Sequence, residues 1–127
     1  MRIAMMMAAI LLAGCGTRAP DAGQQMYGAY CASCHGPGGQ GDGPLAADLP
    51  VAPPDLTRLS AGNGGVFPYS DVMAQIHGYP GRFHVMPEFG TLLKGRRVPW
   101  KNEMGQTVDT PVALVQVTEY LVSIQQP

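Results

Sequence analysis

Two cysteines and a histidine at residues 31–35 constrain this 127-residue chain more than any other feature. The sequence there is CASCH, so Cys31 and Cys34 are three positions apart and His35 follows directly. Thiols and an imidazole at this spacing are typical of a metal site, a redox disulfide or the covalent attachment of a cofactor. The fold must present these three side chains together to whatever they bind.

The first residues indicate the compartment in which these thiols must persist. Arg2 and the apolar run over residues 3–13, which is too short to span a bilayer, predict an export signal over 1–14. The end of that run, Leu12 to Cys15, resembles a bacterial lipobox, in which the cysteine becomes the lipid-modified first residue. This resemblance implies a lipid anchor at Cys15, a tether over 15–20 and a folded domain over 21–127. A soluble, cleaved periplasmic form is the alternative.

The exported context favours the covalent interpretation of the cysteine pair. Bare thiols do not persist in an oxidising compartment, and C-x-x-C-H is the attachment motif of c-type haem. Each thiol adds to one porphyrin vinyl group, and the imidazole that follows ligates the iron. A thioredoxin-type motif is typical of a βαβ setting, zinc needs four ligands, and a plain disulfide does not require His35. The sequence therefore predicts one haem c bound through Cys31 and Cys34, with His35 as an iron ligand.

Helical patterns separated by long loops predict an all-α domain of about four helices wrapped around the haem. The chain contains 17 Gly and 12 Pro, and residues 36–68 have little periodicity. A loop of that length suits a compact fold when it wraps a ligand. No segment has a competing strand pattern. The helices are predicted over residues 21–32, over 70–78 with Ser70 as N-cap, over 88–95, and over 110–125 with Thr110 as N-cap.

Met86 is the predicted second iron ligand. It lies downstream of the haem motif and before the last helix, and Pro87 holds it in an extended conformation that fixes the direction of its thioether. His84 is the alternative, because two residues of spacing in an extended segment point both side chains the same way.

These segments together resemble a class I monohaem cytochrome c over residues 21–125. The resemblance rests on GQQMYGAYCASCHG, GDGP, VMPEFG and VTEYLVSIQ, which match that family's opening, first loop, distal-ligand loop and C-terminal helix. It implies that Gly23 and Tyr27 of the first helix cross Tyr120 and Leu121 of the last. It also implies that the carbonyl of Pro44 accepts the Nδ1–H of His35 and so fixes the imidazole ring.

Closed His/Met ligation predicts a one-electron carrier rather than an enzyme. The expected setting is a periplasm-facing electron-transport chain, at a membrane surface with respiratory complexes as partners, with inner and outer membrane left open. The net charge of −1 gives no argument for a nucleic-acid partner. Two alternatives remain. One is a haem-based sensor or peroxidase-like enzyme with an open sixth position, and the other is a fixed haem subunit of a larger oxidoreductase. The basic stretch Lys94–Lys101 is either a docking site for an acidic partner or a solvated face.

Overall fold

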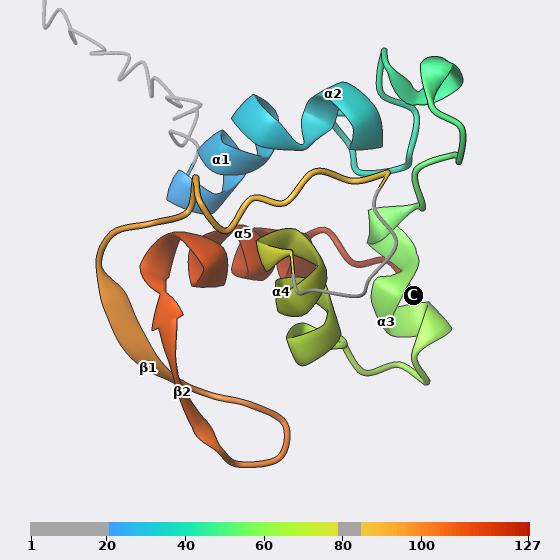
Figure 1. Cartoon of the computed structure of the whole chain (residues 1–127). Coiled ribbons are helices and arrows are strands. Elements are labelled where there is room, and N and C mark those ends of the chain that lie inside the picture. Colours follow the sequence, from blue (N-terminus) through green and yellow to red (C-terminus); the bar gives the residue numbers. More distant parts are fainter. Residues whose placement is uncertain (1–20, 79–84) are drawn as a thin grey trace, which may run out of the picture.

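The computed structural model describes residues 21–78 and 85–127, and these form a helical domain with one β-hairpin (Figure 1). None of the helices in this part of the chain is both long and apolar enough to cross a membrane. The elements in chain order are α1 (Ala22–Tyr30), α2 (Ala32–His35), the 3₁₀ turns η1 (Ala46–Asp48) and η2 (Leu56–Arg58), α3 (Leu59–Gly62), α4 (Tyr69–His77), β1 (Arg97–Lys101), β2 (Thr107–Pro111) and α5 (Val112–Ser123).

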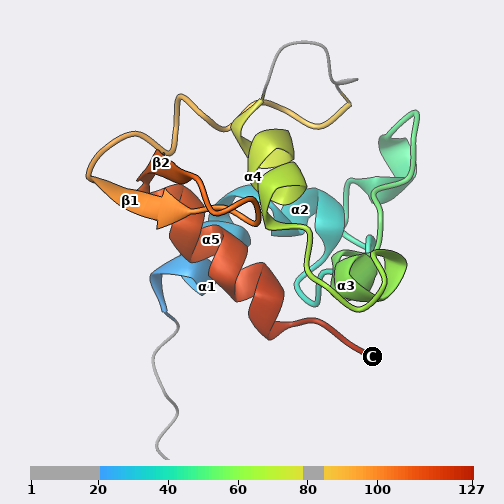
Figure 2. The ribbon, with the colours of Figure 1, turned by 90° about the horizontal axis from the view of Figure 1, so that it is seen from below.

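Helices α1 and α5 cross in close contact, and α5 lies across the middle of the molecule (Figure 2). Asp21 caps α1 by accepting a hydrogen bond from the Gln24 N–H. At the crossing, a Cβ on Gly23 would collide with the backbone carbonyl of Gln116, so only glycine permits this approach. The rings of Tyr27 and Tyr120 lie 5.1 Å apart between centroids. The predicted crossing of the first and last helices is therefore confirmed.

The hydrophobic core lies between these two helices and α4. Its side chains repeat on one face of each helix, as expected for amphipathic helices. Around this core lies a ring of half-buried apolar residues from the short elements and loops, including Leu56 of η2, Leu59 of α3, Met86 and Phe89. The buried hydrophobic residues are Tyr27, Phe67, Met73, Ile76, Leu93, Leu114, Val117 and Leu121.

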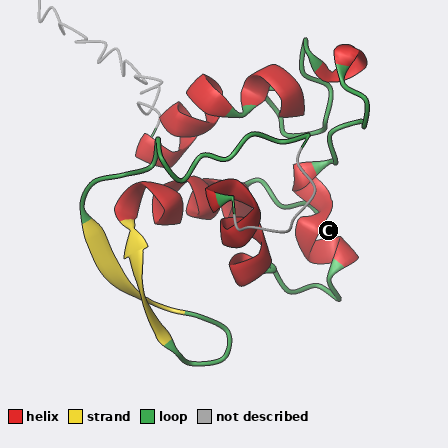
Figure 3. Ribbon diagram, viewed as in Figure 1, coloured by secondary structure: helices red, strands yellow, loops and turns green. Residues whose placement is uncertain are grey.

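The predicted helical fold is confirmed, but the β-hairpin corrects the expectation that no segment forms a strand. Strands β1 and β2 pair antiparallel, with Val98 opposite Thr110 and Trp100 opposite Val108 (Figure 3). The Asn102 side chain closes the turn, because its Oδ1 accepts hydrogen bonds from the backbone N–H groups of Met104 and Gln106. Thr110 is therefore part of β2, and α5 begins one residue later than expected, with Pro111 rather than Thr110 as its N-cap.

The structure corrects two further boundaries around α4. The helix begins at Tyr69, so Ser70 lies in its first turn, and the Ser70 N–H and hydroxyl donate to the Glu103 carboxylate. Residues 88–95 form turns rather than a helix, because Phe89 and Gly90 donate their N–H groups to carbonyls at the C-terminal end of α4. The predicted stop at Gly78 is confirmed, since this residue ends α4 with a left-handed φ of 88°.

Candidate functional site

The cysteine–histidine motif lies at the bend between α1 and α2. The Cys31 N–H still donates to the Tyr27 carbonyl of α1, and the Cys31 carbonyl accepts from the His35 N–H at 2.9 Å. The motif is therefore one tight helical turn that continues from α1 (Figure 1). The turn ends at Gly36, whose φ of 78° is open to glycine, and the Gly36 carbonyl accepts a 2.7 Å hydrogen bond from the buried Tyr27 hydroxyl.

The two thiols do not behave as a zinc site or a redox pair. Cys31 and Cys34 are half-buried and form no disulfide with each other. Burial, with the Cys34 thiol as a smaller contribution, raises the pKa of Cys31 to about 11, whereas a redox-active cysteine needs a lowered pKa. In the described part of the chain, no three His, Cys, Asp or Glu side chains are grouped so that they could hold a metal ion.

His35 is oriented for ligation through its Nε2 atom. Its side chain is buried, and its Nδ1 lies 3.3 Å from the carbonyl oxygen of Pro54. Placing the proton on Nδ1 satisfies that carbonyl and leaves the Nε2 lone pair available for a metal. Burial lowers the pKa of His35, and the hydrogen bond to Pro54 opposes this only in part, so the imidazole stays neutral. A neutral imidazole is the form that binds iron.

The partner of His35 is Pro54, which corrects the expectation that it is Pro44. The Gly43–Pro44 segment lies against the backbone of α2. The Gly43 N–H donates to the Cys34 carbonyl, and the Leu45 N–H donates to the Ser33 carbonyl. A Cβ on Gly43 would overlap the Ser33 carbonyl, so this segment lies directly against the outer backbone of α2. It packs against the backbone of the motif, whereas the hydrogen bond of the imidazole ring goes to Pro54.

Backbone contacts hold the long loop after α2 against the motif and so position the Pro54 carbonyl beside His35. The Leu56 N–H donates to the Gly39 carbonyl at 2.7 Å. Gly41, with a φ of 81°, lies so close to the Pro53 carbonyl that a side chain would not fit. Directly after Pro54, Asp55 caps η2 by accepting hydrogen bonds from the Thr57 hydroxyl and N–H, which hold the pKa of its carboxyl below its usual value.

Met86 is half-buried against the hydrophobic core. Its Sδ lies 4.0 Å from Nε2 of Gln75, a residue of α4, so the amide can donate a weak hydrogen bond to the thioether. His84, the alternative ligand, lies outside the described residues. The sequence did not indicate Gln75 or Pro54, because both act through contacts made by segments far apart in the chain.

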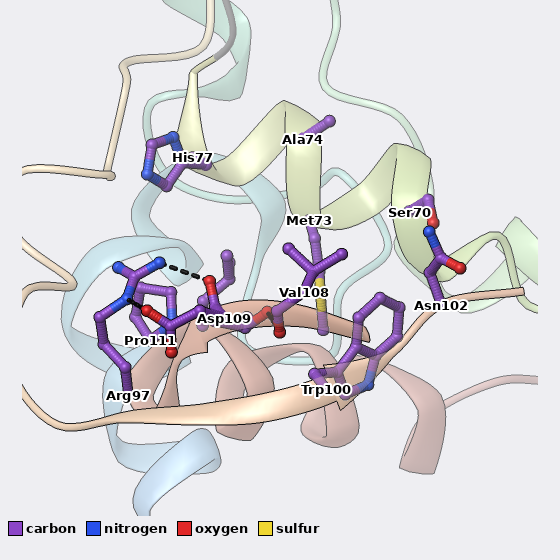
Figure 4. A pocket seen from close by; sticks show the side chains of 12 residues that line it. Ser70, Met73, Ala74, His77, Arg97, Trp100, Asn102, Val108, Asp109 and Pro111 are labelled. Atoms are coloured by element: carbon purple, nitrogen blue, oxygen red, sulfur yellow. Dashed lines mark hydrogen bonds and ion pairs between the residues drawn. The ribbon is translucent and has the colours of Figure 1, made fainter. Parts of the chain in front are cut away.

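Two hollows differ in their relation to the motif. A small apolar pocket lies directly beside Cys31, with Met26, Tyr30, Ile76, Phe89 and Leu93 among its walls. A larger cavity of about 160 Å³ lies between α4 and the β-hairpin, and none of the motif residues lines it (Figure 4). The pocket that adjoins the motif is therefore the small apolar one, and the motif residues do not line the larger cavity.

These residues fit a covalently attached porphyrin. Free thiols three positions apart, a neutral imidazole held by a carbonyl, and adjacent apolar walls are what such a group needs. The model of a protein family described as cytochrome C oxidase, cbb3-type, subunit III matches residues 18–98, a range that includes the motif, Pro54 and Met86. Searches of curated proteins and of solved structures find no match to this chain.

Proposed function

Because this chain belongs to the family of cbb3-type cytochrome c oxidase subunit III, and so carries a covalently bound c-type haem, we propose that it is a one-electron carrier with His35 and Met86 as its axial ligands. The haem, when bound, supplies reversible one-electron exchange at its iron. In this proposal Cys31 and Cys34 form the two thioethers, His35 binds from one side and Met86 closes the other. A closed site suits a carrier, because no position is left for a substrate.

The hydrogen bond between His35 Nδ1 and the Pro54 carbonyl is the observation that carries this proposal. It fixes the ring orientation and the tautomer, and it increases the electron density at Nε2. The same side chain is buried, which limits the positions that the ring can take. A histidine held this firmly changes little in position between oxidation states, which is the requirement for fast electron exchange.

The contact between Gln75 and Met86 supports the second ligand. Met86 is the described methionine that adjoins the core from a loop, and the proline directly after it restricts its backbone to an extended conformation. The amide of Gln75 limits where its thioether can point.

Absorption spectra of the holoprotein test the proposal. We expect a c-type spectrum with the weak far-red sulfur-to-iron band when oxidised, and no change when carbon monoxide is added to the reduced protein. A missing far-red band together with a rapid carbon monoxide shift would instead support the sensor or peroxidase-like alternative.

A second candidate is a fixed haem subunit of a membrane oxidase, because the matching family is described as an oxidase subunit. The chemistry of the haem would be the same, and the partnership would differ. Purification after mild detergent extraction distinguishes the two. A carrier separates from other membrane proteins on size exclusion, whereas a subunit migrates with a larger complex of fixed stoichiometry.

The proposed location is a periplasm-facing membrane surface. This proposal includes a signal over residues 1–14, a lipid on Cys15 and a tether over 15–20, all of which lie outside the described residues. Cys15→Ser should release the haem protein into the soluble periplasmic fraction. If the variant remains in the membrane fraction with its signal removed, the lipid anchor is wrong.

A further inference from the structure

The positive charge of the described domain is concentrated in one stretch. Lys94, Arg96, Arg97 and Lys101 lie within eight consecutive residues that lead into and through β1, and all four are exposed. Arg58 is the remaining cation among residues 21–78 and 85–127. A cluster of this kind creates a local positive potential on a chain whose net charge is −1.

Three of these cations form no ion pair within the described residues. Arg97 pairs with Asp109 across the hairpin, with Nε 2.5 Å from Oδ2 (Figure 4). The other nearby hairpin acid, Glu103, accepts hydrogen bonds from Ser70 of α4. Within the described residues, no ion pair involves Lys94, Arg96 or Lys101.

Apolar side chains accompany these charges. Leu92 is 58% exposed, and Met104 at the tip of the hairpin is 76% exposed. These exposed residues follow one another between positions 92 and 104, and we call Leu92, Lys94, Arg96, Lys101 and Met104 together the cationic face. Cations next to exposed apolar groups are the combination that binds an anionic membrane surface, where the charges meet lipid headgroups and the apolar groups enter the acyl boundary.

The cationic face lies where the preceding chain joins the domain. Gly23, near the start of α1, packs against Gln116 of α5, and the Val112 N–H at the start of α5 donates to the Arg96 carbonyl at 2.9 Å. The base of the hairpin and the beginning of the domain therefore both adjoin the first turns of α5 (Figure 1).

The opposite side of the molecule is acidic. Asp42, Asp48 and Asp55 are exposed in the loop that follows α2, and no lysine or arginine lies between them. This loop and the hairpin are at opposite sides in both views (Figures 1 and 2). An anionic surface would attract one side and repel the other, which gives the domain a single preferred orientation. We propose that the cationic face docks on anionic phospholipid.

Vesicle binding tests this directly. The haem protein without the signal over residues 1–14, carrying Cys15→Ser so that neither signal nor lipid contributes, is mixed with vesicles of phosphatidylcholine alone or with phosphatidylglycerol added. Lys94→Gln, Arg96→Gln and Lys101→Gln together should weaken binding to the anionic vesicles at least about tenfold, since each cation near such a surface is worth roughly fivefold in affinity. Binding to neutral vesicles should not change.

A matched control separates the face from net charge. Gln40→Glu, Ala47→Glu and Ala52→Glu lower the net charge by the same three units at exposed positions on the acidic side. This control should bind anionic vesicles within about threefold of the parent, because its new charges lie more than a Debye length of about 10 Å from the bilayer in the proposed orientation. An unchanged haem spectrum and unfolding midpoint in both variants would show that they are folded.

Equal binding of the parent and the cationic-face variant to anionic vesicles would overturn the proposal, as would equal weakening by the control. If vesicle binding is unchanged but electron transfer with the membrane donor slows in the cationic-face variant, the face serves an acidic protein instead.

The apolar part has its own test, because Leu92→Ser with Met104→Ser should lower the binding that persists at 0.5 M salt by about threefold or more. Unchanged high-salt binding would remove these two residues from the face.

Discussion

At the scale of single residues, Met86 has the largest expected effect on the iron. Met86→Ala should retain covalent haem, because Cys31 and Cys34 are untouched, but it should lower the reduction potential by on the order of 100 mV or more, since axial ligands set haem potentials over a wide range. The open position should also bind carbon monoxide when reduced. Potentiometry and a carbon monoxide difference spectrum measure both effects.

Met104→Ala is the matched control for this change. The side chain is 76% exposed on the hairpin, so its loss should alter neither the potential nor the reaction with carbon monoxide. If Met86→Ala resembles this control, the sixth ligand is a different residue.

The histidine's partner shows what a local pattern can and cannot predict. The motif itself indicates the roles of Cys31, Cys34 and His35, because thioether spacing is set by four consecutive residues. Choosing between Pro44 and Pro54 as acceptor requires knowing how the loop returns, and that depends on the non-local hydrogen bond from Leu56 N–H to the Gly39 carbonyl.

At the scale of elements, the α1–α5 crossing depends on Gly23. Gly23→Ala places a methyl group against the Gln116 carbonyl, so the helices must separate. Overpacking of this kind costs about 1–3 kcal/mol of unfolding free energy. Gly28→Ala in the same helix is the control, because nothing lies within 4 Å of its new Cβ. The control should stabilise by up to about 1 kcal/mol through helix propensity. Denaturant unfolding that shows equal effects would contradict the crossing.

The contact between the hairpin turn and α4 should depend on pH. Burial alone would raise the pKa of Glu103, but the hydrogen bonds from Ser70 outweigh it and hold this pKa below its usual value. A carboxyl group whose pKa is lower in the folded state than in the unfolded state stabilises the fold at pH values above its unfolded pKa. This stabilisation disappears as the pH falls through the folded pKa. The parent should therefore unfold at a higher temperature than Glu103→Gln at pH 7, and the two melting curves should converge by about pH 3. A difference that persists at low pH would assign the effect to packing.

The hairpin was missed in the sequence for reasons that apply to short strands generally. Pro99 within β1 weakens a strand prediction, and the pairing of Val98 with Thr110 is not local. The helices α1 and α4, in contrast, could be predicted because an apolar stripe and the end signals at Asp21 and Gly78 lie within a few residues of each other.

At the scale of the whole molecule, the polypeptide has a modest core for its size. The buried hydrophobic residues lie mainly at the α1–α5 crossing and on α4, whereas apolar residues of the segments between α2 and α4 and after α4, such as Leu56, Leu59 and Met86, stay half-buried around them. The segment from Gly36 to Pro54 is held to the motif mainly by backbone hydrogen bonds. A covalent porphyrin supplies apolar surface that the side chains do not, which is also why periodicity alone could not predict how the loops fold.

Stability should therefore depend on the haem. Cys31→Ala with Cys34→Ala, produced without haem, should retain part of its far-ultraviolet helical signal, because Gly23 and Tyr27 still pack on α5. It should lose the cooperative thermal transition of the holoprotein. A group that interacts with the native state alone stabilises that state, and a covalently attached group cannot dissociate from it. Hydrogen exchange should then be fastest in residues 36–55, where the Gly41, Gly43 and Leu45 amides are protected by hydrogen bonds to motif carbonyls. The control is the holoprotein with Met86→Ala, which keeps the thioethers and should unfold cooperatively. A haem-free chain that unfolds as cooperatively and at the same temperature as the holoprotein would show that the polypeptide core is sufficient by itself.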